Sequence, residues 1–321
     1  MKKSVLVVLV IVVVVAVVVS LVVRPRITTE APYTVKIGYL NIVASLPLFV
    51  AEDMGFLKEE GVEFKSLPIG TSNQLVDGLI AKNLDCFIEA SAVPVLAVEL
   101  QSPGKLKVFS VSEITPQAPF DALLVKTESP IKGLADLAGK KVGVFPGSTA
   151  TRLLKKHLSD KGVDVSETTF IPIPAQNMLA ALVGGSIDAL HAYEPTTAIA
   201  LTKGGVRQLY GSVYAEMLSP NPQGVAAVNM VFLREHPKTA KKVIRALERG
   251  MAFMKENDAE TRKILVSRMK LSEDAAKRCI FLYMLPHSEI RSEILQKYAD
   301  MLTELQELGG RVEVQNVLYR P

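Results

Sequence analysis

Apolar segments of two kinds alternate along the chain from residue 35 onward. Short runs of strand length stand at 35–40, 62–69 and 85–91, and the segments between them, 46–61 and 72–83, carry apolar residues at helical spacing. Because strands that alternate with helices in this way are normally parallel and joined by helical crossovers, the pattern predicts an α/β protein.

The same order of elements returns about 104 residues later. Five short matches carry this repeat: Lys36-Ile37-Gly38 with Lys141-Val142-Gly143, Gly61-Val62-Glu63 with Gly162-Val163-Asp164, Leu67-Pro68-Ile69 with Ile171-Pro172-Ile173, Asn73-Gln74-Leu75 with Asn177-Met178-Leu179, and Asp85 with Asp188. Five matches in one order predict two β-α-β-α-β units of one design. A solenoid needs three or more stacked units, so two similar lobes facing each other fit the repeat better.

After the second unit the pattern predicts two further strands, 206–212 and 225–233, and then a helical tail. The tail helices are expected to begin near residues 237, 259 and 273, and the last one covers 291–308. Because the chain returns across the strand at 225–233 before the tail begins, we expect the tail to pack on the first lobe.

The two connections between the lobes are expected near 115–125 and 220–230, where prolines interrupt the pattern. The first lobe is therefore predicted to be discontinuous, made of residues 34–120 and 228–321. The second lobe is predicted to consist of residues 121–227.

The first 26 residues differ from the rest of the chain. After two lysines, an apolar run extends from Val5 to Val19 and on to Val23, where Arg24-Pro25-Arg26 ends it. This length matches the roughly 20 residues that cross a bilayer and exceeds the usual apolar core of a signal peptide, so we expect an uncleaved membrane anchor in preference to a cleaved signal. In either case residues 27–33 are a linker, and the remainder lies outside the cytoplasm, anchored to the cell membrane or else secreted or periplasmic.

The composition narrows the class of partner. Apolar residues make up 49% of the chain and charged residues 22%, as in globular proteins. The net charge is only +4, and no basic stripe is interleaved with aromatic residues, which argues against nucleic acid as a partner. The two cysteines, Cys86 and Cys279, stand alone in apolar contexts, which favours buried free thiols over a disulfide.

Polar residues gather where the predicted strands end and the helices begin. In open parallel sheets, ligands bind beyond the carboxyl ends of the strands, so these positions predict a ligand cleft between the lobes. The candidate ligand-binding residues are Asn41, Ser45, Thr71, Ser72 and Glu89 in the first lobe, and Ser148, Thr149, Asn177, His191, Tyr193 and Glu194 in the second.

A structural role is the alternative at each of these positions. Ser or Thr at a helix start is often an N-cap that accepts from free backbone amides, although the same amides can hold an anion. His191 can be a strand-end residue facing solvent, and Glu194 can be a favourable charge at a helix start. If Glu89 and Glu194 do face the cleft, the two carboxylates suit an amine or an aminopyrimidine and oppose a bare anion such as nitrate.

Support for catalysis is weak. The four histidines show no metal-ligand spacing, and the chain contains no G-x-S-x-G elbow, P-loop or G-x-G-x-x-G turn. We therefore expect no catalytic residue, no metal and no cofactor.

Three segments resemble a known family: IGYLNIVASLPLFVAEDMGFLKEEGVEF (37–64), PIKGLADLAGKKVGVFPGSTATRLL (130–154) and PIPAQNMLAALVGGSIDALHAYEP (172–195). They are similar to the solute-binding proteins of ABC importers in the nitrate, sulfonate, taurine and thiamine-precursor group. The resemblance implies a type II periplasmic-binding-protein fold, in which two α/β lobes joined by a two-strand hinge trap a ligand. It also implies delivery of the ligand to an ABC permease and its ATPase. We expect the protein to be a monomer.

The resemblance also implies which residues touch the ligand. The matching positions are Asn41, Ser45, Thr71, Ser72, Ser148, Thr149, Tyr193 and Glu194. Three features depart from the family: Tyr193 stands where a Trp is common, and His191 and Glu89 are not family residues. A small organosulfonate or taurine-like ligand is the first expectation. An aminopyrimidine thiamine precursor is the alternative, and so is an enzyme on the same fold, as in the menaquinone pathway.

Overall fold

The computed structural model describes residues 33–321, and the expectations for residues 1–26 and for the linker as far as residue 32 lie outside the described residues. Within this region one sheet has six strands: β1 (Thr34–Leu40), β2 (Glu63–Ile69), β3 (Cys86–Ser91), β4 (Leu106–Ile114), β10 (Asn221–Asn229) and β11 (Met284–Pro286). Their order is β11-β4-β10-β3-β1-β2. This sheet and the helices on it form the first lobe.

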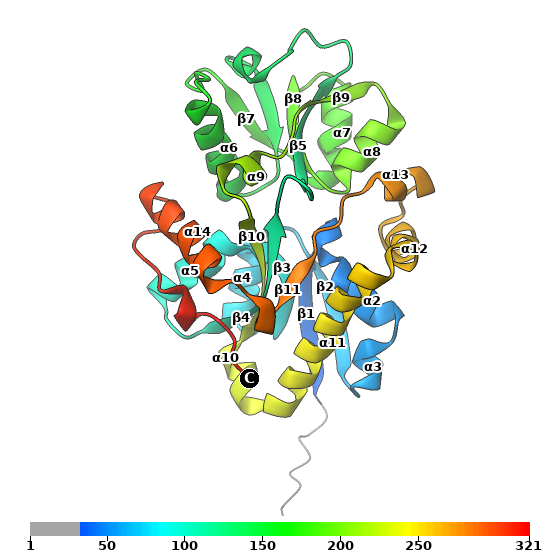
Figure 1. The fold of residues 1–321 in the computed structure, drawn as a ribbon, viewed down its shortest axis with the longest axis vertical. Helices are drawn as coiled ribbons and strands as arrows, with labels where there is room; N and C mark the ends of the chain where they lie inside the picture. Colours follow the sequence, from blue (N-terminus) through cyan, green and yellow to red (C-terminus); the bar gives the residue numbers. More distant parts are fainter. Residues whose placement is uncertain (1–32) are drawn as a thin grey trace, which may run out of the picture. The chain divides into compact units, whose positions relative to one another are not determined.

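The other sheet of the described region has five strands and forms the second lobe. They are β5 (Asp121–Lys126), β6 (Lys141–Val144), β7 (Thr169–Pro172), β8 (Ala189–Tyr193) and β9 (Val206–Tyr210), in the order β7-β6-β8-β5-β9. Its helices are α6 (Ser148–Asp160), α7 (Ala175–Val183), α8 (Thr196–Lys203) and α9 (Val213–Met217), and a 3-10 turn, η2, covers Leu134–Leu137. Figure 1 shows these elements grouped apart from the first sheet.

The repeat in the sequence is a repeat in the structure. Strand β1 lies between β2 and β3 and is parallel to both, and β6 lies in the same way between β7 and β8. The matched aspartates make the same contacts. The amide of Lys36 donates to Oδ2 of Asp85 at 2.8 Å, and the amide of Lys141 donates to Oδ2 of Asp188 at 2.8 Å. The prediction of two βαβαβ units is therefore confirmed.

The helices of the first lobe come from both ends of the chain. Those from the first unit are α2 (Leu46–Asp53), α3 (Phe56–Glu59), α4 (Ser72–Ile80) and α5 (Ala92–Gln101), with a 3-10 turn, η1 (Val43–Ser45), before α2. The single helix predicted at 46–61 is thus two helices. Gly55, between them, has a φ of +76°, a left-handed conformation that ends a helix and that glycine adopts without strain.

The later helices are α10 (Met230–Glu235), α11 (Pro237–Glu256), α12 (Asp258–Met269), α13 (Glu273–Arg278) and α14 (Ser292–Glu304), with 3-10 turns η3 (His287–Glu289) and η4 (Val314–Asn316). Helix α11 packs on α2 and α3, and α14 packs on β10 and α5, so the tail lies mainly on the first lobe as predicted. Helix α13 is different because it packs against α8 of the second lobe. No helix of residues 33–321 combines the length and apolarity that crossing a bilayer requires.

Two connections join the sheets. Residues 115–120 link β4 to β5, and residues 211–220, which include α9, link β9 to β10. They leave the first sheet side by side, because Ile114 at the end of β4 pairs with Asn221 at the start of β10.

Strand β10 differs from the sequence prediction in its position. It runs over Asn221–Asn229, so residues 221–227, which the sequence pattern predicts in the second lobe, pair within the first sheet. The strand expected at 225–233 ends early because the Asn229 side chain caps α10, accepting from the Val231 amide at 2.6 Å. The alternation of polar and apolar residues does not reveal this cap.

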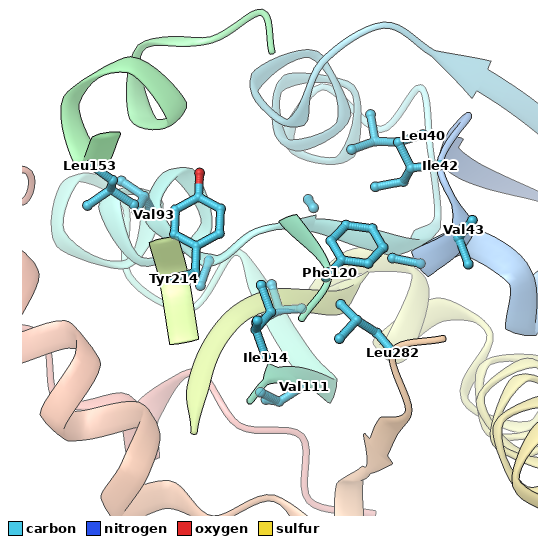
Figure 2. Packing of buried hydrophobic residues seen from close by; sticks show 14 of the residues in the cluster. Leu40, Ile42, Val43, Val93, Val111, Ile114, Phe120, Leu153, Tyr214 and Leu282 are labelled. Atoms are coloured by element: carbon cyan, nitrogen blue, oxygen red, sulfur yellow. The ribbon is translucent and has the colours of Figure 1, made fainter. Parts of the chain in front are cut away.

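An apolar core runs through both lobes. The largest cluster of buried side chains includes Leu40 from the first lobe, Leu153 and Tyr214 from the second, Phe120 from the first connection and Leu282 from the segment after α13 (Figure 2). Two further clusters fill the space between the first sheet and α11 and the space beneath α7 in the second lobe. Because burial of one large apolar side chain stabilises a fold by roughly 1.5–3 kcal/mol, the shared cluster holds the lobes close to each other.

Candidate functional site

Two adjoining cavities lie between the lobes, beyond the carboxyl ends of the central strands. The inner cavity has a volume of about 80 Å³ and the outer one about 530 Å³. Residues that line both of them are Leu40, Ile42, Thr71, Phe145, Pro146 and Tyr193. One buried water needs roughly 10–15 Å³ on this scale, so the inner cavity has room for a small organic group.

Glu89 forms part of the wall of the inner cavity. It is near the end of β3, and its side chain is buried, with 6% of the residue exposed. The Ser112 hydroxyl donates to it, at 3.0 Å from Oε1 and 3.3 Å from Oε2. Burial raises the pKa of the Glu89 carboxyl well above its ordinary value, and the Ser112 hydrogen bond lowers it by less.

The position of this carboxyl group depends on Gly224 in the neighbouring strand β10. A Cβ atom on Gly224 would lie 1.7 Å from Oε1 of Glu89 and 2.3 Å from Oγ of Ser112. No side chain larger than hydrogen fits there unless the carboxyl group moves. Gly224 of β10 therefore leaves the space through which the Glu89 carboxyl group of β3 reaches Ser112 of β4.

Aromatic side chains form much of the remaining inner wall. Phe120, Phe145, Tyr193 and Tyr214 all line it. The Tyr193 and Tyr214 hydroxyl oxygens are 2.6 Å apart, and the Tyr193 ring lies 5.4 Å from Phe145 and 6.0 Å from Phe120, measured between centroids. Figure 2 shows Phe120 and Tyr214 within the core cluster that spans the lobes. Burial raises the pKa of both tyrosines, so their hydroxyls are protonated.

His191 lies behind this aromatic wall. It is fully buried and lines neither cavity; its Nε2 is 2.8 Å from Oδ2 of Asp121. Asp121 also accepts from the Val213 amide at 2.9 Å and from the Ser212 hydroxyl. The His191 ring makes edge contacts with Tyr193 and Tyr214. The Asp121–His191 pair thus supports the two tyrosines from behind.

Glu194 lines the outer cavity, but its carboxyl group has partners within the chain. Oε2 accepts from the Ala198 amide at 3.1 Å, at the start of α8. The Ile280 amide and the Cys279 thiol, from the segment after α13, also donate hydrogen bonds to this carboxyl group. Burial raises the pKa of Glu194 to about 7, although these hydrogen bonds lower it by a smaller amount. Glu194 therefore joins α8 to the C-terminal segment.

The helix starts around the cleft are of two kinds. The start of α4 is capped, because the Thr71 side chain before it accepts from the Gln74 amide at 3.2 Å. The Ser72 hydroxyl accepts from the Ser91 amide at 2.9 Å. Helix α6 instead begins after Gly147 without a capping bond from any side chain of residues 33–321. Ser148 and Thr149 at this start line the inner cavity. The amides of the first turn of α6 therefore retain hydrogen-bonding capacity beside the cleft.

The remaining candidates lie in different surroundings. Asn41 is exposed and lines the outer cavity. Ser45 is buried in η1, its hydroxyl without a hydrogen-bond partner in the described region, and it lines neither cavity. Asn177 is exposed on α7 and lines neither cavity, whereas its neighbour Gln176 lines the outer one.

Several wall residues have no counterpart in the candidate set. They are Ser112 on β4, Phe120 in the first connection, Phe145 on the turn after β6, Tyr214 on α9, Gln223 on β10 and Leu282 after α13. The signal that points to some of them is the proline-rich composition of the two connections, because a hinge between lobes borders the cleft on one side. No local pattern marks Ser112 or Leu282.

The described walls of the cleft contain acidic side chains and no basic ones. Among the described residues, none that lines either cavity is Lys, Arg or His, whereas Glu89 and Glu194 bring two carboxyl groups. The same region contains no group of three or more His, Cys, Asp or Glu placed to hold a metal ion. Cys86 and Cys279 are buried free thiols with raised pKa values, and neither lines a cavity.

Similarity to known proteins agrees with this architecture. A Bacillus subtilis protein named as an aliphatic sulfonates-binding protein is 25% identical over 281 residues, which cover 85% of this chain and 82% of that protein. The structure of the alkanesulfonate-binding protein SsuA from Xanthomonas axonopodis pv. citri bound to MOPS superimposes with a TM-score of 0.75 at 21% identity, covering 92% of this chain and all of that one. The desulfurization enzyme DSZB has the same fold, with a TM-score of 0.66 at 17% identity, covering 89% and 96% of the two chains.

The structural likenesses establish the two-lobed binding-protein fold that the sequence predicts, and the Bacillus relative is a binding protein and not an enzyme by name. The family described as NMT1/THI5 like matches residues 43–261, which is more than half of the chain. The chain therefore belongs to the NMT1/THI5-like family.

Proposed function

We propose that this protein is the extracytoplasmic solute-binding protein of an ABC importer. It captures a small polar or anionic ligand, an organosulfonate or taurine-like compound, between its lobes and delivers it to the permease and its ATPase. It acts as a monomer, held at the membrane by its N-terminal segment or released if that segment is cleaved. The names of its relatives support this function.

One observation carries the proposal: the cavities are made by both lobes, and the lobes are in direct contact on either side of them. On one side the Val43 amide of the first lobe donates to the Glu194 carbonyl of the second at 3.4 Å. On the other side Arg152 of α6 pairs with Glu307, which follows α14. A ligand that contacts both walls favours this closed arrangement over an open one by its difference in affinity.

The start of α6 supports an anionic group on the ligand. Its first amides lack a side-chain cap, and Ser148 and Thr149 add hydroxyls beside them. A helix start favours a nearby anion by roughly 0.3–1 kcal/mol, and a sulfonate has three acceptor oxygens for these donors. The absence of basic residues from the described cleft walls weighs against a bare anion such as nitrate.

An aminopyrimidine is the second candidate ligand, and the aromatic inner wall favours it. Phe145 and Tyr193 offer ring faces for stacking, and Glu89 offers an acceptor for an amino group. An enzyme on this fold has less support, because the Bacillus subtilis relative that covers most of this chain is a binding protein by name.

The test is to identify what the protein binds. The full chain is purified gently in detergent and its mass measured under native conditions. A thermal-shift panel of taurine, alkanesulfonates, nitrate, bicarbonate and aminopyrimidines follows. A co-purifying small molecule, or a Tm that rises with the concentration of one panel member, is the expected result. Turnover of a panel compound without stable binding would overturn the proposal in favour of an enzyme.

A further inference from the structure

We infer that the inner cavity is a subsite for a cationic ammonium group of the ligand, held between Glu89 and the aromatic wall. This inference rests on the proposed function, because it concerns which end of the ligand enters the inner cavity. The ligand class that it names is a small amine or quaternary ammonium compound, zwitterionic where it also carries a sulfonate.

Glu89 has no basic partner in the cavity wall. It is buried with one neutral donor, the Ser112 hydroxyl, and no basic side chain of the described region lines the same wall. A buried carboxylate is costly unless a cation or several donors compensate it, so Glu89 is protonated while the cavity is empty. A cation that arrives with the ligand stabilises the ionised form of Glu89, whereas a second anion adds repulsion.

The rest of the cavity wall also suits a cation. Phe120, Phe145, Tyr193 and Tyr214 line the cavity that Glu89 borders. The faces of aromatic rings are negative and attract ammonium groups, with or without methyl substituents, most strongly where water is excluded. The rings are held in place, since His191 and its partner Asp121 support both tyrosines from behind.

The position of the Glu89 carboxyl group depends on a specific glycine. Gly224 leaves space where any other residue would place a Cβ atom 1.7 Å from Oε1 of Glu89. The carboxyl group can therefore lie across the sheet and face the cavity. A carboxylate needed only for stability has no requirement for this close approach.

Glu194 is a matched control, because it is a second buried carboxyl group of the same cleft. Its oxygen already accepts from the Ala198 amide, and the Ile280 amide and Cys279 thiol act on it as well. It lines the outer cavity and not the inner one. Neutralising Glu194 removes a carboxyl group of the cleft and leaves the subsite at Glu89 in place.

The experiment uses three pairs of probes that differ in the ammonium group. They are taurine with isethionate, N,N,N-trimethyltaurine with 3,3-dimethylbutanesulfonate, and choline with 3,3-dimethylbutanol. The last pair lacks the sulfonate and so tests the subsite alone. Calorimetric titrations are made on the full chain in detergent, as wild type, Glu89→Gln and Glu194→Gln.

We expect the wild-type protein to prefer the ammonium member of at least one pair by about ten-fold to a hundred-fold, as is typical of hydrogen bonds and ion pairs to a buried charge. Glu89→Gln should abolish this preference. Glu194→Gln should retain the ratio of affinities within each pair even where it changes the affinities themselves, because Glu194 lines the outer cavity only. The wild-type preference can be measured even if a variant does not fold.

Equal binding of both members in every pair, or a preference that survives in Glu89→Gln, would overturn the inference while leaving a binding protein. Failure of all six probes to bind overturns it as well. The proposed function is judged separately, by the co-purified ligand and the wider panel.

Discussion

Arg152 in α6 of the second lobe forms an ion pair with Glu307, which follows α14 of the first lobe in the chain. The Arg152 Nε lies 2.7 Å from the Glu307 Oε2. The Glu307 side chain is only 6% exposed, whereas Arg152 is half exposed. Burial raises the pKa of Glu307, and Arg152 lowers it by less. The pair therefore joins the lobes at one side of the cleft, where opening would separate the two charges.

Arg152→Ala should weaken ligand binding without altering the cleft wall, because Arg152 lines neither cavity. A half-exposed ion pair contributes about 0.5–1 kcal/mol, so the affinity should fall about two- to five-fold, chiefly through faster ligand release. Stopped-flow release rates and solution scattering measure the two effects. Lys156→Ala is the control, since Lys156 pairs with Asp160 of the same helix. Equal effects of both substitutions would contradict a role for Arg152 in lobe closure.

Gly224→Ala should displace the Glu89 carboxyl group. The new methyl group would overlap Oε1, so the side chain or β10 must move, at a cost of about 1–3 kcal/mol in the free energy of unfolding. Binding of any ligand that uses Glu89 should fall in parallel. Urea denaturation and ligand titration check this prediction. Gly309→Ala is the matched control, because no described atom lies within 4 Å of the Cβ position there. Unchanged stability and binding in Gly224→Ala would show that the strand accommodates the methyl group.

The pH dependence of stability should reveal Glu194. Its pKa is about 7 in the folded protein against 4.5 for the free group, so between these values the folded state binds more protons than the unfolded state. The stabilising contribution is thus complete below pH 4.5 and is lost as the pH rises through 7, by about 3 kcal/mol at most. Glu89 acts in the same direction, because its pKa is also raised.

Urea denaturation between pH 5 and 8 measures this slope. Raising the pH across this range should cost the wild-type protein more stability than it costs Glu194→Gln, whose amide carries no charge at any of these values. His157, whose pKa is lowered by burial, acts in the opposite direction in both proteins and cancels in the comparison. Equal slopes in the two proteins would contradict the assignment.

Asp121→Ala should destabilise the second lobe and loosen the aromatic wall. It removes the acceptor for His191, Ser212 and the Val213 amide, all of which are buried. Breaking such a buried network costs about 3–5 kcal/mol. Thermal denaturation checks the loss of stability, and near-ultraviolet circular dichroism follows the tyrosines. The exposed Asp160→Ala should change the stability by no more than about 0.5 kcal/mol. A loss in Asp121→Ala no larger than this would show that the buried network is not needed.

The sequence by itself determined the architecture. The two units and the matched aspartates Asp85 and Asp188 follow from a local pattern and its repetition, because parallel strands and their crossovers are specified by residues close together in the chain. The same logic brought Thr71, Ser148 and Tyr193 to the cleft, since the carboxyl ends of parallel strands meet at one edge of a sheet.

Only the tertiary structure decided what each polar side chain faces. Glu89 and Glu194 both lie near the end of the third strand of their unit. Glu89 borders the inner cavity, whereas Glu194 is bonded to α8 and to a segment some 85 residues later. His191 points to Asp121 and not to the cleft, and Tyr214 reaches the wall from a connection. These outcomes depend on contacts between residues far apart in the chain, and the packing of the lobes, which no local pattern encodes, determines them.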